Sequence, residues 1–559
     1  MKKKNKIIII GAVSAGTSAA AKARRKSEDL EIVIYERDKY ISYGTCGLPY
    51  FLSGEIENIN RLIVNTKERF EKRFNVKVKT LHEVTAIEPD RKIVHIKDLS
   101  TDLSFDDSFD SLIIATGSVP VILKFNKKLL KNIFALKTID DAISLKKYMD
   151  KLDMKGEGKS AAIIGGGFIG LELLDAFLGR GYKVSIIEKT SQILPVFDEE
   201  IVGYLDNYLA EKKINIYRGD EVIDLVTDSS GNAVSLKTLN GRVIKADIIF
   251  FGIGTRPNIK LARDCGIKIG KSGSIAVDEF MRTNFKYIYA AGDCCECENL
   301  VSREKRSYNL ASIASRQGRT AGYNAAGGNK KFVGSTVTSI IKVLDVAVAK
   351  TGLSLKEAMQ MGIDAGFIEN HYLSHSGYYP GSDMIHMMII FNKTDSRLLG
   401  FQAVGKSGVD KKADIISTAI RGNLKIRELT NLDLGYQPAY GSVRDSINIL
   451  GMIGENRAED EVEFISIKEL KDIIKKGEDA KILDVRTKRE YENGHIGGSV
   501  LMHIDELRDG LDKLGKDDRI IIYCETGYRA YLGLRILKNR GFQDVRLLNG
   551  SYLSWERKI

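Results

Sequence analysis

The stretch KIIIIGAVSAGTSAAAKARR (residues 6–25), followed by EIVIYERD (31–38), predicts a strand, a tight turn, a helix and a second strand. The same plan returns in SAAIIGGGFIGLELLDAFLGRGY (160–182) and KVSIIEKT (183–190). Each copy has an apolar run, a glycine-rich turn, a helix rich in small residues, and an acid at the end of the second apolar run. This is the βαβ fingerprint of a dinucleotide site, in which glycines let the backbone approach a pyrophosphate at the helix N-terminus.

Two such copies in one chain predict two nucleotide sites, whereas a single copy would read equally well as an ordinary strand–turn–helix unit. The acid of each copy is placed to accept hydrogen bonds from a ribose. The predicted residues are Gly11, Val13, Gly16 and Glu36 in the first site, and Gly165, Gly167, Ile169, Gly170, Glu188 and Gly254 in the second.

Two later segments fit the first site. SLIIATGSVP (111–120) and YIYAAGDCCE (287–296) are short apolar strands that end in small or acidic residues. A strand ending in Gly-Asp places a carboxylate against a sugar-like hydroxyl, and the small residues of the following helix (308–328) allow close packing. The residues assigned here are Ala115, Thr116, Gly117, Gly292 and Asp293.

Composition limits the class of protein. A chain of 559 residues predicts three to four domains at about 150 residues each. A net charge of +11 is too dilute for a nucleic-acid surface but suits an anionic small ligand. No stretch approaches the ~20 apolar residues that cross a bilayer, and the start lacks a cleavage signal, so we expect a cytoplasmic protein without a membrane partner. Six sparse cysteines are then free rather than paired.

The pattern of apolar and polar residues changes in the second half of the chain. Alternating apolar residues at 336–353 and 384–392 predict antiparallel strands, and residues 412–423 predict an amphipathic helix. The polar stretch GENRAEDEVE (454–463) is typical of a linker, after which a separate unit with its own strands begins.

The stretch SYGTCGLPY (42–50) contains one cysteine, Cys46. A lone redox cysteine cannot form a disulfide with a neighbour, so its oxidised state is a mixed disulfide with a small thiol, a persulfide or a sulfenic acid. The following residues predict a helix start, which favours a thiolate. A buried, inert cysteine is the alternative interpretation.

With both fingerprints, the ATG and GD segments and Cys46, the chain up to residue 453 resembles the flavoprotein pyridine nucleotide-disulfide oxidoreductases. The spacing Ser42-x-x-x-Cys46-Gly-Leu-Pro is similar to the single-cysteine branch, which includes coenzyme A disulfide and persulfide reductases and NADH oxidases. The C-terminal unit resembles a rhodanese through DVR (484–486), GHIG (494–497) and the loop CETGYR (524–529).

The resemblance implies an α/β fold with two Rossmann-like domains, an α+β dimerisation domain and an α/β rhodanese domain. It also implies FAD, NADH or NADPH, coenzyme A, and a homodimer. The expected parts are FAD binding (1–118 and 256–330), NAD(P)H binding (119–255), dimerisation (331–453), a linker (454–463) and rhodanese (464–559).

The resemblance also assigns roles to residues. None of the seven histidines lies in a tail motif like that of the two-cysteine disulfide reductases, so the family implies tyrosines of the partner subunit as proton donors; packed interface aromatics are the alternative. The acid candidates are Tyr436, Tyr378 and Tyr379. The coenzyme A candidates are Ser42 and Thr45, with the basic residues Lys22, Arg24, Arg25 and Arg61; Ser42 is also assigned to the FAD site.

In the rhodanese loop, successive N–H groups between Cys524 and Arg529 form an anion-binding nest that stabilises a thiolate or persulfide. Cysteine phosphatases have one more residue before the arginine, which ranks that reading lower. Cys294, Cys295 and Cys297 lack the ligand count of a zinc site, so we expect no metal. The charge of Glu188 favours NADH, although Lys189 beside it could permit NADPH.

The leading hypothesis is an NAD(P)H-dependent flavoprotein that reduces coenzyme A disulfide, coenzyme A persulfide or polysulfide at Cys46, fused to a sulfurtransferase acting at Cys524. One alternative is an NADH oxidase or peroxidase that cycles through Cys46 sulfenic acid. Another is a sulfur-relay protein with little reductase turnover, which the complete second fingerprint disfavours.

Overall fold

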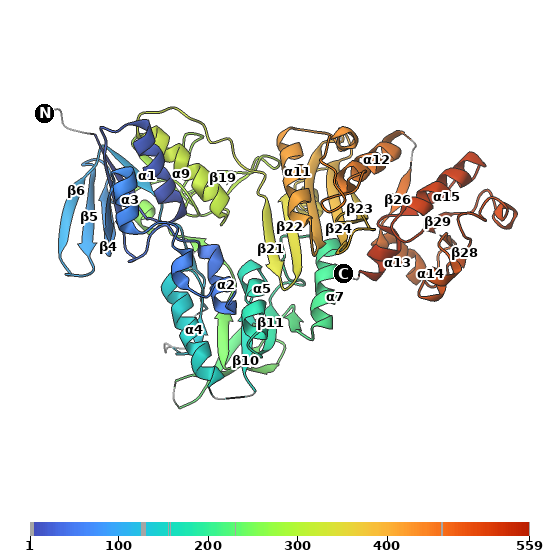
Figure 1. Ribbon diagram of the computed structural model, residues 1–559, viewed down its shortest axis with the longest axis horizontal. Coiled ribbons are helices and arrows are strands. Elements are labelled where there is room, and N and C mark those ends of the chain that lie inside the picture. Colours follow the sequence, from blue (N-terminus) through green and yellow to red (C-terminus); the bar gives the residue numbers. More distant parts are fainter. Residues whose placement is uncertain are drawn as a thin grey trace. The chain divides into compact units, whose positions relative to one another are not determined.

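The computed structural model describes residues 5–123, 130–154, 156, 158–229, 231–459 and 462–557. The chain divides into two compact units (Figure 1). The first comprises the residues up to Leu194 together with Ile214–Val337, and the second comprises Pro195–Lys213 together with Thr338 to the C-terminus. We describe each unit by itself.

The first unit contains a parallel five-stranded sheet in the order β18-β7-β1-β2-β3. Its central strand is almost purely isoleucine, and Ile7, Ile8 and Ile9 are at most 1% exposed, as expected of a parallel sheet covered on both faces. The strands are β1 Lys6–Ile10, β2 Glu31–Glu36, β3 Lys77–Thr80, β7 Ser111–Ile114 and β18 Ile288–Ala290. The helices α1 Ser14–Lys26, α3 Lys67–Phe74, α8 Lys260–Asp264 and α9 Ala311–Ala325 belong to this half.

Helices α1 and α9 lie side by side, as their glycines require. A Cβ on Gly318 of α9 would lie 2.2 Å from the Ala15 carbonyl oxygen, and one on Gly322 would lie 2.1 Å from that of Ala19. The close packing predicted from the small residues of this segment is therefore confirmed.

A second parallel sheet of the same unit has the order β12-β11-β10-β16-β9. It is built from β9 Ile133–Phe134, β10 Ser160–Ile164, β11 Lys183–Glu188, β12 Asn215–Arg218 and β16 Ile248–Phe251, with α4 Ile139–Asp153, α5 Phe168–Glu172 and α6 Leu174–Leu178. Two Rossmann-like sheets in one chain confirm the fold predicted from the repeated fingerprint.

Smaller sheets complete the first unit. Two are antiparallel and three-stranded: β4 His82–Glu88, β5 Ile93–Asp98 and β6 Ser104–Ser108; and β13 Val222–Thr227, β14 Ala233–Thr238 and β15 Val243–Lys245. Two-stranded pairs join β8 Ser118–Pro120 to β17 Thr255–Pro257, and β19 Cys297–Glu298 to β20 Lys305–Arg306.

The second unit contains an antiparallel sheet in the order β21-β22-β25-β24-β23. The predicted antiparallel strands and the amphipathic helix are confirmed. The elements are β21 Ser339–Val343, β22 Val346–Gly352, β23 Ala365–Leu373, β24 Met384–Asn392, β25 Leu398–Gly405, α7 Glu199–Glu211, α10 Leu355–Gln360, α11 Val409–Arg421, η3 Ile426–Asn431 and α12 Ser446–Glu459.

A parallel sheet of order β26-β30-β29-β27-β28 forms the C-terminal part of this unit. Its elements are β26 Glu463–Ile465, β27 Lys481–Asp484, β28 Val500–Leu501, β29 Ile520–Tyr523, β30 Val545–Leu548, α13 Ile467–Lys476, α14 Lys488–Glu492, η4 Leu511–Lys513, α15 Tyr528–Asn539 and α16 Ser551–Glu556.

The segment predicted as a linker, 454–463, differs from that expectation. Helix α12 continues to Glu459, residues 460 and 461 lie outside the described residues, and β26 begins at Glu463. The helix continues because its face is packed: a Cβ on Gly454 would lie 2.8 Å from Ile426, and the Arg457 guanidinium lies over the rings of Phe391 and Phe464.

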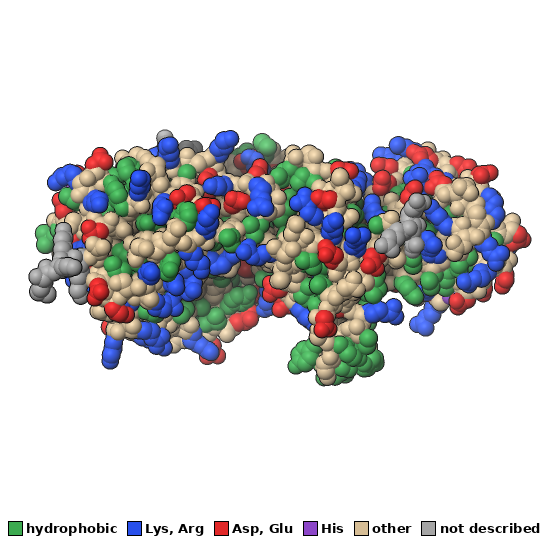
Figure 2. Space-filling model, turned by 90° about the horizontal axis from the view of Figure 1, so that it is seen from above, with side chains coloured by type: hydrophobic (Ala, Val, Ile, Leu, Met, Phe, Trp, Pro, Cys, Tyr) green, Lys and Arg blue, Asp and Glu red, His purple; other side chains and the backbone are tan. Residues whose placement is uncertain are grey.

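The distribution of charged side chains on the surface agrees with the dilute net charge of the sequence. On the face shown in Figure 2, Lys and Arg side chains are interspersed with Asp and Glu. Among the described helices, none is long and apolar enough to cross a membrane.

Candidate functional site

The turn between β1 and α1 depends on its glycines. Gly11 has φ +104°, and a Cβ there would lie 2.3 Å from the Ala115 carbonyl oxygen; one on Gly16 would lie 1.8 Å from that of Gly11. Val13 is the N-cap of α1, with no side-chain cap and no acid in the first turn. The first amides of α1 are therefore left for an anion such as a pyrophosphate.

Glu36 ends β2 beside this turn. One carboxylate oxygen accepts a hydrogen bond from the Ala12 amide at 2.7 Å, and the other accepts one from the Asp38 amide at 2.9 Å. Burial raises the pKa of the carboxyl group, while the two amide donors lower it. The backbone fixes the orientation of this carboxylate, and each oxygen retains a lone pair for a ribose hydroxyl.

The ATG and GD segments meet at the carboxyl ends of neighbouring strands. The Ala115 amide donates to the Ile10 carbonyl and the Ala291 amide to that of Ile114. This brings Ala115, Thr116, Gly117, Gly292 and Asp293 to the same edge as the glycine turn. A partner that sequence reasoning missed is Lys137, whose Nζ lies 3.1 Å from the Asp293 carboxylate.

The second turn repeats the first. A Cβ on Gly170 would lie 2.4 Å from the Gly165 carbonyl oxygen, and Gly165 itself packs against the Gly252 carbonyl. Glu188 accepts a hydrogen bond from the Gly166 amide at 2.7 Å, as Glu36 does from Ala12. Gly167 caps α5 without a side-chain cap, Ile169 lies in the first turn of α5, and Gly254 has φ +98° on the loop after β16.

Lys189, which could favour NADPH by neutralising the charge of Glu188, has another partner in the structure. Its Nζ lies 2.9 Å from the Glu221 carboxylate, and both side chains are exposed. In the structure, the Lys189 ammonium therefore pairs with Glu221.

Cys46 lies on the short helix η1 (Thr45–Gly47), just before α2 (Leu48–Ser53), and it is exposed, so the buried, inert alternative is wrong. The Ser42 amide donates to the Ala12 carbonyl at 2.8 Å, which ties the cysteine segment to the first glycine turn. Further along, the Gly44 amide donates to Leu62, next to η2 (Ile59–Leu62). These backbone bonds hold the predicted redox sulfur beside the predicted flavin turn.

Sequence reasoning missed Glu172, the last residue of α5. Burial raises its pKa to about 7. Its charge is among the causes that raise the pKa of Tyr50 in α2, after burial, and Cys46 adds to that rise. A titratable acid near neutrality therefore acts on α2, the helix that follows Cys46.

The predicted coenzyme A residues divide into two groups, and Arg24 is a correction. Arg24 is 4% exposed, and its guanidinium donates to the backbone carbonyls of residues 27, 28, 30, 74 and 75. It closes the end of α1 and cannot reach a phosphate. Arg25 and Arg61 are exposed, and Lys22 lies over the Tyr323 ring. Thr45 is half-buried beside Cys46.

In the second unit, the predicted tyrosines are exposed. The hydroxyls of Tyr378 and Tyr436 lie 3.1 Å apart, and this hydrogen bond lowers the pKa of Tyr378 and raises that of Tyr436. Tyr379 packs edge-on against His375. The geometry pairs Tyr436 with Tyr378 rather than with Tyr379.

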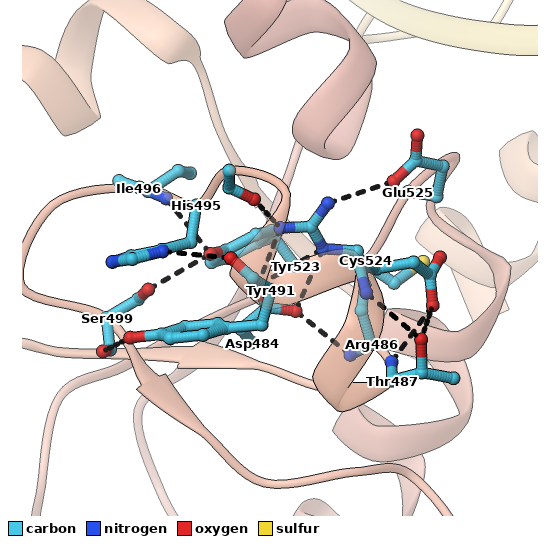
Figure 3. Close-up of polar contacts among 12 residues, drawn as sticks. Asp484, Arg486, Thr487, Tyr491, His495, Ile496, Ser499, Tyr523, Cys524 and Glu525 are labelled. Atoms are coloured by element: carbon cyan, nitrogen blue, oxygen red, sulfur yellow. Dashed lines mark hydrogen bonds and ion pairs between the residues drawn. The ribbon is translucent and has the colours of Figure 1, made fainter.

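Cys524 follows β29 and is buried (Figure 3). The Gly527 amide donates to its sulfur at 3.1 Å, and Gly527 takes φ +112° to make that turn. Arg529 lies in the first turn of α15 and donates two hydrogen bonds to Glu490, at 2.5 and 2.8 Å. This ion pair lowers the pKa of Glu490 to about 2 and raises the pKa of Arg529, and Cys524 adds to the latter rise.

Figure 3 shows a second arginine beside the loop. The buried Arg486 donates to the Asp484 carboxylate at 2.9 Å and to Glu525, the residue after Cys524, at 3.0 Å. It also stacks on Tyr552, 3.9 Å from the ring centroid. Through Arg486, the DVR motif therefore contacts the Cys524 loop at Glu525.

Cys294, Cys295 and Cys297 are buried. The Cys294 sulfur donates to the Ala291 carbonyl, and that of Cys295 to Gln317. Among the described residues, no group of three or more His, Cys, Asp or Glu is arranged to hold a metal ion.

Two nucleotide folds, an exposed cysteine beside the first glycine turn, an antiparallel domain and a rhodanese-like domain define the class. The family model of pyridine nucleotide-disulphide oxidoreductases matches residues 5–318, and the model of their dimerisation domain matches 338–446. The rhodanese-like domain model matches 466–558. The chain belongs to the pyridine nucleotide-disulphide oxidoreductases, which use FAD and NAD(P)H, and it carries a C-terminal rhodanese domain.

Two curated relatives match about four fifths of the chain, and two solved structures match nearly all of it. A Methanocaldococcus jannaschii NADH oxidase is 32% identical over 79% of this chain and 97% of its own, and a Staphylococcus aureus coenzyme A disulfide reductase is 31% identical over 80% and 99%. The structure of reduced Bacillus anthracis CoADR-RHD covers 99% of this chain and 98% of its own (33% identity, TM-score 0.94). That of an NAD-dependent persulfide reductase from A. fulgidus covers 98% and 100% (32%, 0.91).

The burial of Glu172 yields a test of stability. Burial raises the pKa of this carboxyl to about 7, so its protonated form stabilises the folded chain, and this contribution is lost as pH rises through about 7. Glu172→Gln cannot ionise, and we expect the difference in thermal midpoint between this variant and wild type to grow from about pH 5 to about pH 8. Glu57→Gln, which changes an exposed acid near α2, shows no such growth. A difference for Glu172→Gln that stays constant over this range would contradict the raised pKa.

Proposed function

We propose that this protein reduces coenzyme A disulfide and coenzyme A persulfide at Cys46 with NADH, and that its rhodanese domain carries sulfane sulfur on Cys524. The observation that carries the proposal is the pair of free cysteines, each at its own active loop and neither with a second cysteine bonded to it. The names of the two solved structures that match nearly the whole chain, and of a relative that matches about four fifths of it, support the choice of substrate.

The proposed reaction combines electron transfer from NADH with thiol–disulfide exchange at Cys46. FAD, when bound, would supply the hydride-accepting chemistry that links NADH to the sulfur of Cys46. The Cys46 thiolate attacks one sulfur of coenzyme A disulfide, forming a Cys46–coenzyme A disulfide and releasing one thiolate of coenzyme A. Two electrons then cleave that mixed disulfide, which returns the Cys46 thiolate and releases the second coenzyme A as its thiolate. With coenzyme A persulfide, the same attack releases sulfide.

Binding follows from the same geometry. FAD would be held at the first turn and the strand ends beside it, by Gly11, Val13, Gly16, Glu36, Ser42, Ala115, Thr116, Gly117, Gly292 and Asp293. The nicotinamide cofactor would be held at the second turn, by Gly165, Gly167, Ile169, Gly170, Glu188 and Gly254. The charge of Glu188 favours NADH over NADPH. Lys22, Arg25 and Arg61 would meet the coenzyme A phosphates, with Ser42 and Thr45 beside the sulfur. A cytoplasmic location agrees with six free cysteines.

Tyr436 would protonate the leaving thiolate, with Tyr378 as its hydrogen-bond partner. Both tyrosines belong to the unit that carries the dimerisation domain, and both are exposed. We infer a homodimer in which each subunit lends this pair to the other's Cys46.

An NADH oxidase cycle through Cys46 sulfenic acid is the second candidate, and it is favoured by the name of the archaeal relative. The fused rhodanese domain, which neither sulfenic acid chemistry nor oxygen reduction uses, favours the sulfur substrate.

Two variants separate the modules. We expect Cys46→Ser to lose NADH-dependent reduction of coenzyme A disulfide by about 10³-fold while keeping sulfur transfer from thiosulfate to cyanide. Cys524→Ser shows the reverse pattern. Anaerobic stopped-flow at 340 nm and thiocyanate formation measure the two activities. Substantial NADH-dependent turnover by Cys46→Ser would refute the proposal.

Mixed dimers test the tyrosines. Tyr436→Phe lowers disulfide reduction by about 10²-fold, the usual effect of removing a general acid. If the tyrosine acts across the interface, co-expressed Cys46→Ser and Tyr436→Phe chains form mixed dimers that each retain one intact site. The mixture then recovers about a quarter of wild-type activity, because about half of the dimers are mixed. Activity no higher than that of the two pure variants would show that the tyrosine acts within its own chain.

A further inference from the structure

A buried polar cluster joins the last helix of the rhodanese domain to the antiparallel sheet. Ser554 of α16 is fully buried, and its hydroxyl donates to the Glu369 carboxyl at 2.5 Å. The same hydroxyl lies 2.8 Å from Nε2 of His371. Glu369 and His371 both belong to β23. None of the predicted active-site residues takes part in this cluster.

A second layer backs these contacts. His371 Nδ1 lies 2.9 Å from His386 Nδ1 on β24. Tyr204 of α7 stacks on His386 with ring centroids 4.0 Å apart, and its hydroxyl lies 3.3 Å from the Ser554 hydroxyl. Each of these side chains is at most 5% exposed. Just after α16, the Arg557 carbonyl accepts a hydrogen bond from the Asn207 side chain of α7 at 2.7 Å.

One arrangement of protons satisfies the cluster. Burial lowers the pKa of both histidines, to about 4 for His386, so both rings are neutral. His386 then donates from Nδ1 to His371, His371 donates from Nε2 to Ser554, and Ser554 donates to Glu369. In the described part of the chain, His386 Nε2 has no partner, which suits a bare lone pair better than an N–H.

The opposite side of the same short segment holds the sulfur loop. The Tyr552 amide donates to the Cys524 carbonyl at 3.0 Å, and the Leu553 amide donates to that of Glu525 at 3.1 Å. The Ser551 hydroxyl accepts a hydrogen bond from the Cys524 amide at 3.4 Å. Every residue that follows Gly550 in this turn therefore contacts either the loop or the cluster.

Asn549 extends the bridge. Its side-chain oxygen accepts a hydrogen bond from the Glu369 amide at 2.9 Å, and its nitrogen donates to the Phe367 carbonyl at 3.2 Å. A Cβ on Gly550 would lie 2.9 Å from that of Glu369, so the two backbones are in close contact. Residues 549–554, here called the bridge segment, are thus bonded to the Cys524 loop on one side and to β23 on the other.

We propose that Ser554 and Glu369 are positioning residues for sulfur transfer: through the bridge segment, strand β23 of the dimerisation domain holds the Cys524 loop in its active geometry. The proposal rests on the proposed function of Cys524. Removing the Ser554 hydroxyl leaves Glu369 and His371 buried without their shared partner, and such groups are satisfied only if the segment moves.

The test uses the full-length holoenzyme with thiosulfate as donor and cyanide as acceptor. We expect Ser554→Ala to lower kcat for sulfur transfer about tenfold with little change in KM, the loss of one buried hydrogen-bond donor. Glu369→Gln keeps near wild-type transfer because its amide oxygen still accepts from Ser554, whereas Glu369→Ala behaves as Ser554→Ala does. Asn207→Ala is the matched control, since Asn207 bonds the exposed carbonyl of Arg557 outside the cluster.

Two readouts separate positioning from misfolding and from failure of the proposed function. NADH-dependent disulfide reduction at Cys46 remains unchanged in a folded Ser554→Ala enzyme. In a Cys46→Ser background, the alkylation rate of Cys524 changes at least about fivefold in Ser554→Ala, even if wild-type enzyme transfers no sulfur. Transfer and alkylation rates equal to those of Asn207→Ala would overturn the proposal.

The pH profile provides a further readout. Burial raises the pKa of Glu369 to about 8; Glu200 adds to the rise, while Ser554 and Arg557 oppose it. Tyr204, His371 and His386 face the group and are neutral there. The protonated form of Glu369 stabilises the folded cluster, and this contribution is complete at acid pH and is lost as pH rises through about 8, where the buried carboxyl ionises. Glutamine cannot ionise. The ratio of the transfer rate of Glu369→Gln to that of wild type therefore rises from about pH 7 to about pH 9. A constant ratio would contradict the role of Glu369.

Discussion

The contact between two backbone segments at each glycine turn is the constraint on which the structure depends. A side chain at Gly16 would overlap the Gly11 carbonyl, and a side chain at Gly170 would overlap that of Gly165. Because helix and strand pass this close, the first helical amides remain open to a pyrophosphate. The same turn anchors the cysteine segment, since the Ala12 carbonyl accepts a hydrogen bond from the Ser42 amide. The turn proposed to bind a nucleotide and the segment proposed to carry the redox sulfur are thus joined through one piece of backbone.

The two sulfurs for which we propose reactions have different surroundings. Cys46 is exposed on a short helix, open to a bulky thiol, whereas Cys524 is buried beneath a loop fixed by Arg486, Arg529 and the bridge segment. An open cysteine suits an exchange that forms a mixed disulfide, and an enclosed one suits a persulfide that must be protected from other thiols. The contrast gives a physical reason for having two cysteines in one chain.

Local patterns in the sequence were sufficient for the strand–turn–helix units, the antiparallel strands and both cysteine loops, because each of these depends on neighbours in the chain. Contacts between distant segments were out of reach. Lys137 meets Asp293, and Glu172 approaches Tyr50, only after the domain has folded. Arg24 was misassigned although a signal existed: it follows Gly16 and Ala20 at four-residue spacing, on the buried face of α1.

The identity of the group carried by Cys46 is the most direct test of a coenzyme A-linked reductase. The protein is incubated anaerobically with coenzyme A disulfide, and the Cys46 peptide is analysed by mass spectrometry before and after one equivalent of NADH. The account predicts one coenzyme A on Cys46 that NADH releases as the free thiol. A Cys46 that stays unmodified by coenzyme A disulfide, yet forms a sulfenic acid with peroxide and consumes NADH only with oxygen, would contradict it.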